Sequence, residues 1–168
     1  MTENAPATAQ VLTMLAAGPP RIAGLTAALA PTQLHASPAP GEWSANEVLA
    51  HLRACADMWG KCMTEILTLD HPTLRAINPT TWIEKTDYRE QPFARSFAAF
   101  SAQRTELLAM LAPLTPAAWA RAATVIGAGK PLERTVLFYA AWLARHERPS
   151  NKQDERSARA KRSGRGSP

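Results

Sequence analysis

The chain has 168 residues, 46% of them apolar, which is enough for one domain with a single core. Its net charge of +5 arises at the C-terminus, because residues 1–144 hold 11 basic and 11 acidic residues whereas residues 145–168 hold 8 and 3. No apolar run approaches the roughly 18–20 residues that span a bilayer, and residues 1–7 lack the basic start of a secretory signal. We therefore expect a cytoplasmic protein without a membrane partner.

The first helix is predicted over residues 8–30 in two parts, because Gly18-Pro19-Pro20 interrupts its apolar periodicity. A connector rich in proline follows. The second helix is predicted from Ala45 to about Leu67. Ser44 reads as its N-cap, and Glu47, three residues later, completes a capping box.

The apolar face of the second predicted helix carries three residues with metal-binding side chains. His51 lies at the edge of this face, with Cys55 one turn later and Cys62 two further turns along. The two cysteines are seven residues apart, so their Cα atoms are separated by about 10 Å on a helix. This exceeds the roughly 7 Å that a disulfide can bridge, and we expect free thiols, as in a reducing compartment.

The rest of the chain also favours helices. Residues 72–91 read as irregular, 92–111 as the third helix, 116–121 as a single turn, 125–131 as a loop and 132–147 as the fourth helix. No segment alternates apolar and polar residues between hairpin turns, so no strand is predicted. Four amphipathic helices predict an all-α fold, a four-helix bundle.

The bundle is predicted to fill residues 1–148 and to be followed by a tail, residues 149–168. This tail is rich in Arg, Lys, Ser and Gly, and it has too little apolar surface to offset the entropy cost of ordering, so we expect it to be disordered. Arginine-rich tails bind phosphate backbones without sequence preference. No helix-turn-helix or zinc-finger pattern accompanies the tail, so we expect no specific nucleic-acid partner.

Two histidines, His51 and His146, fall on the core-facing sides of the second and fourth predicted helices. An isolated histidine in such a place is most often a half-buried packing residue. Two that face the same interior could instead share a metal ion, provided that their imidazoles meet. Periodicity alone does not decide between these interpretations.

Two segments carry a resemblance to a known family. Residues 40–52 read Pro-Gly-Glu-Trp-Ser-x-x-Glu-Val-Leu-x-His-Leu, and residues 140–148 read Ala-x-x-Leu-Ala-x-His-Glu-Arg. Together they resemble the DinB-like (DinB/YfiT-like) superfamily over roughly residues 8–148. The resemblance implies a metal-binding four-helix bundle that holds a divalent ion such as zinc or nickel. It further implies a thiol S-transferase or hydrolase, with a small thiol or an electrophile as substrate, and a homodimer.

The family pattern places three histidines around the metal, and this chain matches two of them. His51 and His146 correspond to the first two, but the third falls at Ser150, behind Pro149. Serine is a poor ligand beside imidazole. The abrupt change of composition here resembles a shifted reading frame. One alternative is therefore a non-catalytic helical bundle that has lost its metal.

Another residue could supply the third ligand. Cys55 lies one turn from His51 and would offer a thiolate, although a small packed cysteine is the commoner role. Glu47 could bind the ion or orient His51, although capping is sufficient to explain it. The site thus stays open between an incomplete centre and one completed from the second helix.

Overall fold

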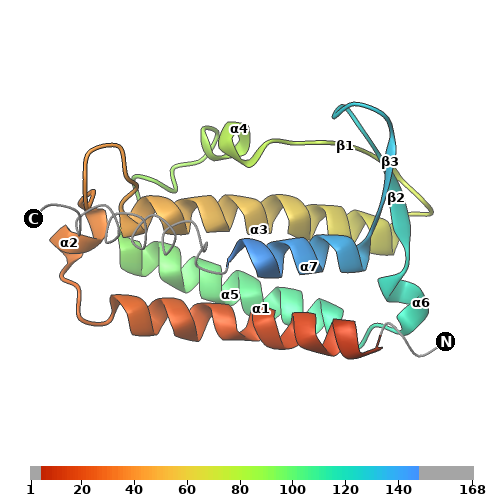
Figure 1. The fold of residues 1–168 in the computed structure, drawn as a ribbon, viewed down its shortest axis with the longest axis horizontal. Helices are drawn as coiled ribbons and strands as arrows, with labels where there is room; N and C mark the ends of the chain where they lie inside the picture. The colour runs from red at the N-terminus through yellow and green to blue at the C-terminus, as the bar shows by residue number, and fades with distance from the viewer. Residues whose placement is uncertain (1–4, 148–168) are drawn as a thin grey trace, which may run out of the picture.

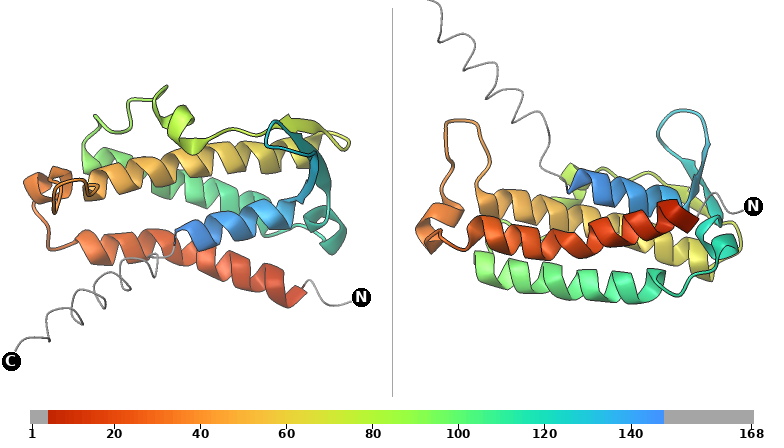
Figure 2. Two further views of the ribbon diagram at one scale, coloured as in Figure 1. Left: turned by 45° about the horizontal axis from the view of Figure 1, so that its top comes forward. Right: turned by 60° about the horizontal axis from the view of Figure 1, so that its bottom comes forward.

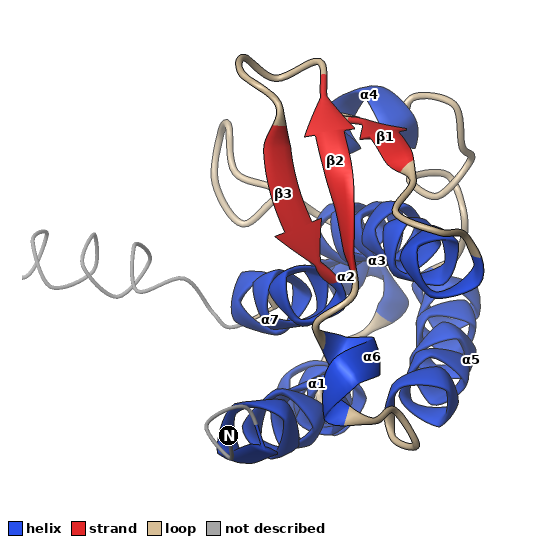
Figure 3. Ribbon diagram, turned by 90° about the vertical axis from the view of Figure 1, so that its right-hand side faces the viewer, coloured by secondary structure: helices blue, strands red, loops and turns tan. Residues whose placement is uncertain are grey.

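Four long helices form a bundle. The computed structural model describes residues 5–147, and the long helices are α1 (Ala5–Thr26), α3 (Ala45–Thr68), α5 (Phe93–Leu111) and α7 (Val136–His146) (Figure 1). Helices α1 and α3 each pack against both α5 and α7, so the four surround a common core (Figure 3). This confirms the predicted four-helix bundle.

Three short helices connect the long ones, and each begins with proline at its first position. They are α2 (Pro31–His35), α4 (Pro79–Ile83) and α6 (Pro116–Trp119). Proline suits this position because its fixed φ fits the first turn and its missing N–H would have no helical partner there. Helix α4 packs on α3, and α6 connects α5 to the strands that precede α7.

A small sheet lies at one end of the bundle, so the prediction that the chain has no strand is wrong. Its strands are β1 (Thr73–Arg75), β2 (Ala122–Ile126) and β3 (Leu132–Thr135). Strand β2 is central and pairs parallel with β1 and antiparallel with β3 (Figure 3).

The connection between β2 and β3 contains two glycines with positive φ, Gly127 at 92° and Gly129 at 85°, which let the chain reverse. Residues 132–135, predicted as helix, therefore belong to a strand. Helix α7 starts at Val136, where the Thr135 hydroxyl accepts a hydrogen bond from the Phe138 N–H at 3.0 Å.

Helix α1 is continuous through Pro19 and Pro20, which corrects the predicted interruption. Proline has no N–H, so Pro19 cannot donate to the carbonyl of Leu15 four residues earlier. The guanidinium of Arg104, on α5, fills this role and donates to the Leu15 carbonyl at 2.9 Å. A neighbouring helix thus satisfies the acceptor that proline leaves open.

The core follows the apolar faces of the long helices, which run side by side in both views of Figure 2. Its largest fully buried apolar side chains are Leu15, Leu49, Met63, Ile66, Phe100, Leu111, Leu143 and Val136. No helix within residues 5–147 has the length and apolar character that a bilayer crossing requires. The predicted disordered tail, with Pro149 and Ser150, lies outside the described residues.

Candidate metal centre

The start of α3 determines where His51 lies. The Ser44 hydroxyl accepts a hydrogen bond from the Glu47 N–H at 3.1 Å, and the Glu47 carboxylate accepts one from the Ser44 N–H at 3.2 Å. This reciprocal capping confirms the predicted helix start. Trp43, just before the cap, packs its ring 5.3 Å from the ring of His51, although 55% of Trp43 stays exposed.

His146 is the last residue of α7, and its ring faces His51 across the gap between the two helices. The two Nε2 atoms are 2.9 Å apart, although 95 residues separate the two positions. Trp59 of α3 meets the His146 ring edge-on at 5.3 Å and stacks on Trp142 at 4.5 Å. The structure therefore brings together the two histidines that the sequence singled out.

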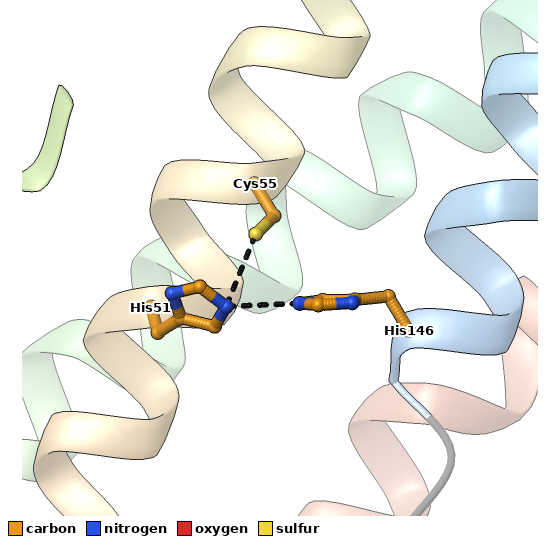
Figure 4. A group of neighbouring side chains, drawn as sticks. All are labelled: His51, Cys55 and His146. Atoms are coloured by element: carbon orange, nitrogen blue, oxygen red, sulfur yellow. Dashed lines mark hydrogen bonds between the residues drawn. The ribbon is translucent and has the colours of Figure 1, made fainter. Parts of the chain in front are cut away.

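Cys55 adds a third donor atom at the same place. Its Sγ is 3.5 Å from Nε2 of His51, and the donor atoms of His51, Cys55 and His146 all lie within 4.8 Å of one another (Figure 4). Cys55 is fully buried, and it lies one turn after His51, so the two point the same way from α3. Of the two open alternatives for a third ligand, the geometry favours the thiol.

The surroundings keep these three groups in their neutral forms. Burial lowers the pKa of His51, and His146 lowers it further. Burial also lowers the pKa of His146, while the negative charge of Glu147 acts in the opposite direction. Burial, together with the charge of Glu147, raises the pKa of Cys55 to about 12. Neutral imidazoles are ready to bind a cation, whereas the thiol must release its proton to do so.

Two of the three spacings between donor atoms are close to those around a tetrahedral ion, and the third, between Cys55 and His146, is at most 4.8 Å. Zinc bonds of about 2.0–2.1 Å to nitrogen and 2.3 Å to sulfur place two such ligand atoms about 3.3–3.6 Å apart. The 2.9 Å between the imidazole nitrogens and the 3.5 Å from Sγ to Nε2 are within a small side-chain adjustment of these values. Two imidazoles and one thiolate are ligands that zinc prefers, and three protein ligands leave a fourth position open.

A small cavity of about 160 Å³ borders the centre beside His51. Trp43 and Ile83 provide apolar wall, whereas Glu47, Thr80 and Arg89 provide polar groups. Of the three residues of the centre, His51 alone lines this cavity, and α4 contributes Thr80 and Ile83 to its wall.

Other residues weighed from the sequence have structural roles. Cys62 is a free thiol, as predicted, and is outside the group of metal-binding side chains found among residues 5–147. Glu47 likewise caps α3 and is not in that group. His35, the last residue of α2, accepts a hydrogen bond from the Phe93 N–H at 3.2 Å and so connects α2 to α5. His71 binds Glu133 at 3.1 Å across the sheet.

Comparison with known proteins agrees with this architecture. The model of the DinB superfamily matches residues 14–149, which is most of the chain. The chain belongs to the DinB superfamily. No curated protein matches it.

Among solved structures, the DinB-superfamily chain is similar to YfiT from Bacillus subtilis, described as a probable metal-dependent hydrolase with an unusual four-helix bundle topology. The TM-score is 0.66 at 18% identity, over 90% of this chain and 87% of YfiT. This likeness supports the shared fold, and the chemistry of the present chain depends on its own residues.

Proposed function

We propose that the protein is a metal-dependent enzyme whose ion, zinc in the first instance, is held by His51, Cys55 and His146. The observation that carries the proposal is the convergence of these three donor atoms within 4.8 Å. The family, and the description of YfiT as a probable metal-dependent hydrolase, agree with it. Cys55 takes the role that a third histidine has in the family pattern.

The reaction class follows from a three-ligand centre with one open position. A divalent ion bound there lowers the pKa of water or of a thiol and supplies a nucleophile near neutral pH. His51 and His146 present Nε2 to the ion, and the buried Cys55 contributes one negative charge once it has lost its proton. We assign hydrolysis of a small electrophile as the first activity. Transfer of a small thiol to the same electrophile uses the same open position and is the second.

The test of the centre uses two matched cysteine variants of the full chain. Wild-type protein purified under zinc-replete conditions is expected to hold about one zinc per chain, and its cobalt form to show a thiolate-to-cobalt charge-transfer band. Cys55→Ser should lose the band and weaken binding at least tenfold, whereas Cys62→Ser should keep both. Metal-free wild-type protein, or an unchanged Cys55→Ser spectrum, would instead support the non-catalytic bundle.

The reaction is tested with zinc-loaded protein and 4-nitrophenyl acetate, with and without 2-mercaptoethanol. Hydrolysis yields acetate and nitrophenol, whereas transfer to the thiol yields a thioester and nitrophenol, so mass spectrometry of the acyl product separates the two activities. His146→Gln is the inactive control. A rate that is the same for this control and the wild type would contradict catalysis at the centre.

A further inference from the structure

The residue after the ligand His146 is an unusually buried acid. Glu147 is the C-cap of α7, and its side chain is only 1% exposed. Its carboxylate pairs with Arg104 of α5, whose side chain is 2% exposed. Both guanidinium nitrogens take part: Nη1 donates to Oε2 at 2.7 Å, and Nη2 donates to Oε1. This is the two-pronged geometry that fixes direction as well as distance.

The same arginine is anchored to α1. Besides Glu147, Nη1 of Arg104 donates to the Leu15 carbonyl that Pro19 leaves without a helical donor. The position of the guanidinium is therefore determined by a backbone acceptor as well as by the carboxylate. Replacing Arg104 with lysine would keep the charge but could not reproduce all these bonds at once.

A second arginine holds the backbone of the same residue. Nη2 of Arg21, on α1, donates to the Glu147 carbonyl at 2.6 Å. The last carbonyls of a helix have no partner within it, so this bond satisfies a group that would otherwise be left open. Gly18 of α1 makes room, because a Cβ there would lie 2.9 Å from Oε2 of Glu147 and 3.1 Å from Nη1 of Arg104.

We infer that Arg104, Arg21 and Glu147 are positioning residues of the metal centre, which fasten the end of α7 so that His146 faces His51 and Cys55. Helix ends fray when nothing holds them, and His146 is on the final turn. The inference rests on the proposed function. It adds that the metal affinity depends on residues that never touch the ion.

The experiment measures cobalt affinity by titration of the full chain and amide hydrogen exchange in the metal-free protein. Arg104→Lys keeps the charge, Arg21→Met removes only the bond to the Glu147 carbonyl, and the double variant Arg104→Met/Glu147→Met leaves no buried charge unpaired. The matched control is Arg121→Met. Arg121 also holds a helix end, donating to the carbonyls of Leu67 and Leu69 at 3.1 and 2.8 Å, but at the far end of α3.

We expect Arg104→Lys and the double variant to bind cobalt at least tenfold more weakly and to exchange the last amides of α7 faster. Arg21→Met should show both effects to a smaller extent. Arg121→Met should bind cobalt and exchange the last amides of α7 as the wild type does. Affinities within threefold of wild type in Arg104→Lys and in the double variant would overturn the inference, as would an equal loss in Arg121→Met. If the wild type itself gives no cobalt–thiolate band, the proposed function fails and the inference fails with it.

Discussion

His51 and Cys55 lie one helical turn apart on α3, and this spacing brings a thiol beside an imidazole. Helical periodicity and the family pattern predict His51 and His146 as candidate metal ligands. They leave Cys55 as one alternative, because periodicity predicts that two residues share a helix face but not that their side chains contact a residue from another helix. The 2.9 Å between the imidazoles depends on packing that no local pattern contains.

We expect the metal-free protein to lose stability as the pH falls from about 7 to 5. The pKa values of His51 and His146 are lowered in the folded state, so the unfolded chain takes up more protons below its ordinary histidine pKa of about 6.5. The stabilisation is therefore present above that pH and is lost below it. Urea unfolding at several pH values measures the effect.

The matched variant for this pH dependence is His51→Gln/His146→Gln, which removes both titrating groups. Its free energy of unfolding should fall less steeply between pH 7 and 5 than that of the wild type. Equal slopes would mean that other groups are responsible for the acid sensitivity.

Among the elements, those defined by local signals agree with prediction, and those that depend on distant partners do not. Ser44 and Glu47 mark the start of α3 in the sequence as in the structure. By contrast, β2 is short and gains its partners from residues 73–75 and 132–135. Helix α1 continues past Pro19, and Arg104, 85 residues later, donates to the Leu15 carbonyl that this proline leaves open. Neither feature can be deduced from a window of neighbouring residues.

The Ser44 N-cap of α3, the helix that carries His51, is expected to contribute to the free energy of unfolding. Ser44→Ala removes the acceptor for the Glu47 N–H and should lower the free energy of unfolding by about 1 kcal/mol. Denaturant unfolding monitored by circular dichroism measures the change. Ser101→Ala, within α5, is the control and should cost nothing, since the Ser101 hydroxyl is buried with no hydrogen-bond partner among the described residues. A cost below about 0.3 kcal/mol for Ser44→Ala would contradict the capping role.

In the whole molecule, the centre joins helices from two distant parts of the chain. The proposed ion, shared by α3 and α7, would bind only when the bundle is assembled, because His146 is remote from His51 and Cys55 in the unfolded chain. Ligands that bind only the folded state stabilise it by mass action. Four amphipathic segments were enough to predict the bundle. They did not predict that His146 of α7 lies beside His51 and Cys55 of α3.

Zinc should therefore raise the melting temperature of the whole protein. At a free concentration of one hundred times Kd, the stabilisation is about 2.7 kcal/mol. For a chain of this size, this corresponds to a shift of roughly 5–11 °C. Thermal unfolding with zinc and with a chelator measures the shift. The His146→Gln variant should show less than about a third of it, and an equal shift in that variant would place the ion elsewhere.

The space that Gly18 leaves for the Arg104–Glu147 pair should restrict which residues relatives of this protein carry at position 18. Any larger side chain at position 18 would collide with the Arg104–Glu147 pair, so the three positions cannot drift independently. Relatives that retain the arginine and the acid should also retain the glycine. Relatives that lose the pair can carry a larger residue at position 18. Helix α1 carries none of the proposed ligands, yet its glycine at position 18 should be conserved together with Arg104 and Glu147, which hold the last turn of α7.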